Sequence, residues 1–107
     1  MGSSETVDVK SDGAGQQELS MRLYVSGATP NSTKAIQNLR QICERFINGK
    51  YKLRIIDIYK HPEIARRDNI VAVPTLIKLT PQPVRVLIGN LSSIVQVVAA
   101  ITGEGST

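Results

Sequence analysis

Few residues of this chain have side chains and spacing suited to catalysis. Cys43 is the only thiol and His61 the only imidazole in the 107 residues. A single thiol excludes an internal disulfide, a Cys-x-x-Cys redox pair and a metal site built from several thiols. Cys43 shares the apolar face of a predicted helix, which indicates a buried, unreactive thiol. His61 has no His, Asp or Cys companion at ligand spacing, so we predict a surface residue there.

The other chemistry that the sequence offers is positive charge. Residues 1–20 carry a net charge of −3, and residues 21–107 carry +7. Such a surface favours an acidic protein partner or a nucleic acid. RNA-binding sheets stack bases on neighbouring aromatic residues, and Tyr24, Tyr51 and Tyr59 form no paired platform in the predicted strands. We therefore prefer a protein partner, with nucleic-acid binding as the alternative.

Composition predicts one small domain. Hydrophobic residues make up 41% of the chain, and with one Phe and no Trp the core must be aliphatic. No apolar run approaches the ~20 residues of a membrane span, and no signal peptide opens the chain. We expect a cytoplasmic protein that does not bind a membrane. Residues 1–20 are poor in large apolar side chains, and we predict a disordered tail before a domain at 21–107.

Apolar periodicity predicts seven elements in that domain. Residues 21–26 form a strand, and a turn at 27–31 leads into a helix capped by Asn31 or Ser32 and apolar at three- and four-residue steps up to Phe46. The next strand ends near Asp57, which we expect to cap a neighbouring backbone group or to face solvent. A short helix beginning at Pro62, a hairpin and a last helix follow, within 60–70, 75–79 with 84–88, and 92–102.

The order βαβαββα predicts an α/β fold of the thioredoxin-like kind. In such folds the first turn carries the reactive cysteines, and here that turn has no thiol, which argues against redox catalysis. The last helix is the weakest element. Its apolar residues follow a helical stripe, but "IVQVV" is β-branched and disfavours a helix. Such a conflict suggests a segment able to adopt two states.

Four blocks of the sequence resemble the KaiB family of circadian clock proteins: "LYVSGATPNSTKA", "LRIIDIYKHPEIARRDNI", "VPTLIKLTPQPVR" and "IGNLSS". The resemblance spans residues 21–93. It implies a non-enzymatic protein without cofactors that binds the ring-shaped ATPase KaiC, competes there with SasA and helps to sequester KaiA. It also implies two folds: a thioredoxin-like monomer that binds KaiC, and a ground state of order βαββααβ that associates to dimers or tetramers.

The resemblance also selects residues. Lys34, Lys78 and Arg85 stand where the family is basic, Arg66 and Arg67 are peculiar to this chain, and all five are predicted to contact the partner. Val73-Pro74 resembles the cis-proline of thioredoxin-like folds. We predict that the fold switch involves Pro74, Pro81, Pro83, Gly89, Asn90 and Ser93. We also predict that isomerisation of the three prolines slows the switch.

This chain departs from the family pattern in two blocks. The typical "GDLSD" is replaced by residues 89–93, "GNLSS", and the acidic pair of "AEED" by Arg66 and Arg67. These changes make the second half more basic. They leave open a partner-binding role outside a complete three-protein clock.

Overall fold

The computed structural model describes residues 5–8, 18–47 and 49–103. Five strands form one sheet of order β1-β3-β2-β4-β5, in which β2 and β3 are parallel and the other neighbours antiparallel. The strands are β1 (Glu5–Asp8), β2 (Leu19–Val25), β3 (Tyr51–Asp57), β4 (Thr75–Thr80) and β5 (Arg85–Ile88), and the helices are α1 (Pro30–Phe46), α2 (Pro62–Arg67) and α3 (Ile94–Thr102).

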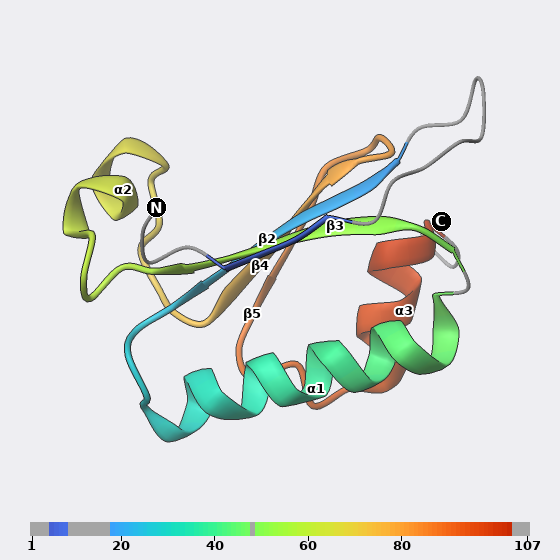
Figure 1. Cartoon of the computed structure of the whole chain (residues 1–107), viewed down its shortest axis with the longest axis horizontal. Helices are drawn as coiled ribbons and strands as arrows, with labels where there is room; N and C mark the ends of the chain where they lie inside the picture. The colour runs from blue at the N-terminus through green and yellow to red at the C-terminus, as the bar shows by residue number, and fades with distance from the viewer. Residues whose placement is uncertain (1–4, 9–17, 48, 104–107) are drawn as a thin grey trace.

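Helices α1 and α3 cover the same face of the sheet, whereas α2 lies beyond one end of the sheet and away from them (Figure 1). The core fills the space between the sheet and these two helices, and its buried residues come from β2, α1, β3, β4 and α3 and from the segment before α3. It is aliphatic, as the composition predicts. Its members are Met21, Leu23, Val25, Ala35, Leu39, Ile42, Cys43, Leu53, Ile55, Leu76, Leu91, Val97 and Ile101.

From β2 onward the element order is βαβαββα, which confirms the predicted thioredoxin-like arrangement over the ground-state order βαββααβ. The hairpin and the short helix at Pro62 lie where the sequence predicts them. The bonds before Pro74, Pro81 and Pro83 are cis.

The predicted tail is the main difference. β1 lies inside it and pairs with β3 in the register Thr6 with Arg54 and Asp8 with Lys52. β2 begins at Leu19, two residues before the predicted start. A tail is therefore the wrong description for residues 5–8, 19 and 20. The β1 segment is mostly polar, and its pairing partner β3 supplies the apolar residues that a sequence pattern detects. Residues 1–4 and 9–17 lie outside the described part.

The first helix begins earlier than its predicted cap. Pro30 occupies the first turn of α1, and Thr29, at the N-cap position, makes no side-chain capping bond. Proline suits this place because its missing N–H would have no partner there. The predicted cap Ser32 is instead buried, and its hydroxyl accepts a hydrogen bond from the backbone N–H of Ser26 at 3.0 Å. Ser32 thus ties the turn to the helix.

The last helix forms despite its β-branched residues. The Ser93 hydroxyl accepts from the backbone N–H of Gln96 at 3.3 Å, and Gly103 ends the helix in a left-handed conformation with φ of 81°. Val97 and Ile101 bury its inner side, at 1% and 2% exposed. Two end caps and two buried side chains outweigh the unfavourable local propensity.

Candidate functional site

The turn at residues 27–31, which carries no thiol, is fixed by a structural contact. The Asp57 carboxylate accepts hydrogen bonds from the backbone N–H groups of Gly27 and Tyr59, both at 2.9 Å, which confirms a capping role. Cys43 is 1% exposed, and burial raises the pKa of its thiol to about 11. Because the thiolate is the reactive form, this thiol is unsuited to redox chemistry. No group of three potential metal ligands occurs within residues 5–8, 18–47 and 49–103.

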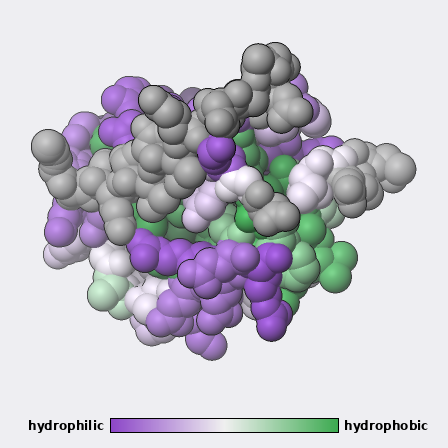
Figure 2. Space-filling view, turned by 45° about the vertical axis from the view of Figure 1, so that its right-hand side comes forward, coloured by the Kyte–Doolittle hydropathy of each residue, from purple (hydrophilic) through white to green (hydrophobic). Residues whose placement is uncertain are grey.

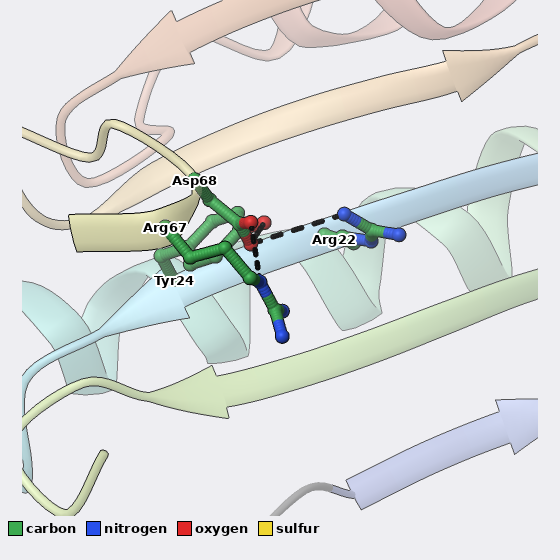
Figure 3. Close-up of polar contacts among 4 residues, drawn as sticks. All are labelled: Arg22, Tyr24, Arg67 and Asp68. Carbon is green, nitrogen blue, oxygen red and sulfur yellow. Dashed lines mark hydrogen bonds and ion pairs between the residues drawn. The ribbon is translucent and has the colours of Figure 1, made fainter. Parts of the chain in front are cut away.

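A polar cluster joins α2 to the sheet on the face opposite α1 and α3, which we call the second face. Asp68, directly after α2, is its centre (Figure 3). The hydroxyl of Tyr24, which is fully buried, donates to Asp68 Oδ2 at 2.7 Å. Arg67 Nε donates to Asp68 Oδ1 at 3.0 Å, and Arg22 Nη1 lies 3.9 Å from Oδ2. These contacts fix the end of α2 against β2.

The same contacts set the charge of the cluster. The hydrogen bond from Arg67, with further help from Tyr24 and Arg22, lowers the pKa of Asp68. Burial, followed by the hydrogen bond to Asp68, raises the pKa of Tyr24. At neutral pH Asp68 is therefore a carboxylate, and the Tyr24 hydroxyl stays protonated and donates a hydrogen bond to it. The cluster has two guanidinium groups for one carboxylate.

The second face carries further basic residues. Side chains alternate between the two faces of a strand, so Arg22, Lys52 and Arg54 point away from the core residues Leu23, Leu53 and Ile55. Arg22 and Arg54 are direct register neighbours on β2 and β3. Arg54 is exposed, and Lys52 is partly exposed. Together with Arg67 they form a basic row across the sheet, which we call the second-face row.

The five predicted contact residues do not share one surface. Lys34 is exposed on α1, and Arg66 and Arg67 are exposed in the last turn of α2. α1 and α2 lie on different sides of the sheet (Figure 1). Lys78 is only 2% exposed, and Arg85 is partly buried beside it on β5. In this fold Lys78 is therefore not available as a surface contact. It lies two residues after Leu76 on β4, so both side chains project to the helix-covered face of the sheet.

The residues predicted for the fold switch lie in one half of the chain. Pro74 is buried before β4, and Pro81 and Pro83 lie in the β4–β5 turn. Gly89, with φ of 121°, directly follows β5. Asn90 Oδ1 accepts a hydrogen bond from the backbone N–H of Ser92 at 3.1 Å, and Ser93 caps α3. The contacts of Asn90 extend to α1, because Asn38 Nδ2 donates to its carbonyl at 2.8 Å.

Sequence reasoning missed the second-face row and the Asp68 cluster. The signal was present in "MRLYV" and "YKLRIID", where basic and apolar residues alternate with period two. That alternation indicates a strand with one basic face. The alternation does not predict the position of Asp68, because Tyr24 and Asp68 are 44 residues apart in the sequence and meet only in the folded chain.

Solved structures define the class of fold. The N-terminal domain of SasA from Synechococcus elongatus is similar with a TM-score of 0.63 and 22% identity, covering 92% of this chain and 96% of that domain. Schistosoma mansoni thioredoxin matches with a TM-score of 0.64 and 21% identity, covering 83% of this chain and 81% of that protein. The protein thus has a thioredoxin-like fold.

Sequence comparison places the chain within that class. The family model described as the KaiB domain matches residues 22–102. The circadian clock oscillator protein KaiB of Trichodesmium erythraeum is 49% identical over 72 residues, which cover 67% of this chain and 69% of that protein. KaiB1 of Synechocystis is likewise 49% identical over 72 residues, with the same two coverages. The chain belongs to the KaiB family, and this membership supports a role in a circadian clock.

None of the helices within the described ranges is long and apolar enough to cross a membrane. The surface is mixed in character. Figure 2 shows a broad hydrophilic band along the lower part of one side of the molecule and a hydrophobic area at the right of the same view. The exposed large hydrophobic residues of the second half are Tyr59, Val71, Val84, Val86, Ile88, Ile94 and Val95.

Proposed function

We propose that this protein is a non-enzymatic clock component that binds a KaiC-type ATPase ring in its thioredoxin-like state. There it competes with SasA and, where KaiA is present, helps to sequester it. The observation that carries the proposal is the combination of KaiB-family sequence with the fold of the SasA N-terminal domain. Two proteins that share a fold have a physical basis for competing for one binding site.

Charge supports the choice of an acidic docking surface. Arg66 on α2 lies on the same side of the sheet as the second-face row. These basic residues are exposed to different degrees. A concentration of one charge sign speeds association with a surface of the opposite sign and sets specificity. Lys34, on α1, would contact a partner only if the partner reaches round to the helix side.

Binding is tested by size-exclusion chromatography with a KaiC hexamer, once with ADP and once with a slowly hydrolysed ATP analogue. We expect co-elution with the ring under one nucleotide, and displacement by excess SasA N-terminal domain. Arg54→Gln should slow association severalfold and weaken its salt dependence. No complex with several KaiC homologues under either nucleotide would refute the proposal.

The same chromatography gives the elution volume of the free protein, and hence its oligomeric state. In the proposed cycle the thioredoxin-like state is a monomer, whereas the other fold associates to dimers or tetramers, with residues 74–93 taking part in the change. Cytoplasmic location belongs to this proposal because KaiC and its partners would have to be in the same compartment.

A nucleic-acid-binding module is the second candidate, and the second-face row is the observation that favours it. However, Tyr24 is buried beneath Asp68, and Tyr51 lies on the helix-covered face with Leu53, so neither offers a ring for stacking. Fluorescence anisotropy with single-stranded RNA at several salt concentrations separates the two functions. Tight binding that falls steeply with salt would favour the nucleic acid.

A further inference from the structure

Two cationic side chains lie side by side on the helix-covered face of the β4–β5 hairpin. Lys78 and Arg85 are direct register partners across the two antiparallel strands. Directly opposite residues have Cβ atoms roughly 5 Å apart and project to the same face. The next pair in the ladder, Leu76 with Leu87, packs in or against the core. The two charges thus flank the apolar interior.

Lys78 and part of the Arg85 side chain are shielded from solvent. Lys78 is 2% exposed, and the Nε atom of Arg85 is buried with no hydrogen-bond partner. Burial, followed by repulsion from Arg85, lowers the pKa of Lys78. Among the described residues, the carboxylates that form ion pairs are Asp68 and Glu63, and neither pairs with this lysine or this arginine.

An uncompensated pair of this kind is electrostatically unfavourable. Buried cations are normally paired, and a buried N–H without an acceptor loses its hydrogen bond to water without replacement. One group with two or more negatively charged oxygens answers both needs. Its oxygens can accept from the guanidinium at Nε and at a terminal nitrogen, and one of them can also accept from the ammonium. Arg85, which remains partly exposed, provides the approach.

We propose that Lys78 and Arg85 form an oxyanion-binding site on the helix-covered face of the β4–β5 hairpin. The ligand is a carboxylate or phosphate group, small enough to reach a lysine with almost no exposed surface. The bound oxyanion stabilises this fold, because it supplies the negative charge that the pair lacks. The site does not depend on the proposed ring binding and can exist without it.

The test measures binding of inorganic phosphate and of acetate to the whole chain by chemical shifts in ¹H–¹⁵N spectra. Sodium chloride at matched ionic strength serves as the reference. We expect saturable shifts centred on residues 76–79 and 84–87, together with a rise in Tm beyond that in chloride. Saturation by phosphate alone identifies a phosphate site, and saturation by acetate as well identifies a site that also accepts a carboxylate side chain.

Variants assign the effect to the pair. Lys78→Met keeps the length of the side chain and Arg85→Gln keeps polarity, and each should weaken binding by about tenfold or more, since each removes a charged hydrogen bond. Arg45→Gln, the same charge change on the exposed side of α1, should bind as the original does. Lys78→Met removes a buried charge, so it should fold at least as well. Absence of saturation in the original chain, or equal losses in all three variants, would overturn the site.

Discussion

Replacing Tyr24 with phenylalanine tests whether the Asp68 cluster holds α2 against the sheet. The change removes one oxygen and leaves the buried ring in place. The lost bond is a charge-assisted one of 2.7 Å to Asp68 Oδ2. Hydrogen bonds to charged groups contribute about 1.5–3 kcal/mol. The Asp68 side chain is 16% exposed and keeps Arg67, so water and that guanidinium compensate in part. We expect a loss of about 1–2 kcal/mol of unfolding free energy.

The loss should depend on pH in a defined direction. The pKa of Asp68 is lowered in the folded protein. A lowered carboxyl pKa stabilises the fold at pH values above the unfolded pKa, about 3.9, and that contribution disappears as pH falls through the folded value. The phenylalanine variant raises the folded pKa toward the unfolded one. The difference between the two proteins should therefore be largest near pH 7 and shrink below about pH 4.

Urea denaturation of both proteins at pH 7 and at about pH 3 measures this difference. Tyr59→Phe is the matched control, because Tyr59 is 78% exposed and should change stability by less than about 0.5 kcal/mol. A Tyr24→Phe protein as stable as the original at pH 7 would contradict the proposed anchoring. An equal loss at both pH values would show that packing, and not the charge of Asp68, is responsible.

Two further predictions concern the core thiol and the last helix. Cys43 should react with a disulfide reagent at pH 8 far more slowly in native buffer than in urea, because it is 1% exposed and burial raises its pKa to about 11. Complete reaction of the native protein within the mixing time would disprove its burial. Ser93→Ala should lower the unfolding free energy by roughly 0.5–1 kcal/mol through loss of the cap on α3, whereas the neighbouring Ser92→Ala should be nearly neutral in the same urea titration.

The fold was largely predictable because its apolar spacing is strong. The α1 stripe through Leu39, Ile42 and Cys43 and the hairpin at residues 75–88 follow from local pattern alone, and their burial matches it. β1 was not predictable in this way. Its residues are mostly polar, and it exists as a strand only through backbone pairing with β3. Backbone pairing leaves little trace in side-chain periodicity.

The candidate contact residues were predictable only in part. Exposure of Lys34, Arg66 and Arg67 agrees with the expectation of a charged surface. Lys78 shows why charge alone is an insufficient guide. Lysines are almost never fully buried, so its burial could be found only from the strand register that places it beside Arg85 and on the side of Leu76. Composition does not reveal on which face of a strand a charge lies.

The second half of the chain carries the features expected of a segment with two states. Along β5 and α3, Val86, Ile88 and Val95 are 54%, 65% and 80% exposed. In the thioredoxin-like state the exposed part of each side chain lacks the stabilisation of burial, which is about 25 cal/mol for each Å² of apolar surface. The Lys78–Arg85 pair adds uncompensated charge to the same hairpin. A few kcal/mol decides between alternative folds. A state or assembly that covers these side chains and supplies an anion would gain this free energy, which is the energetic basis for expecting the second fold in the proposed cycle.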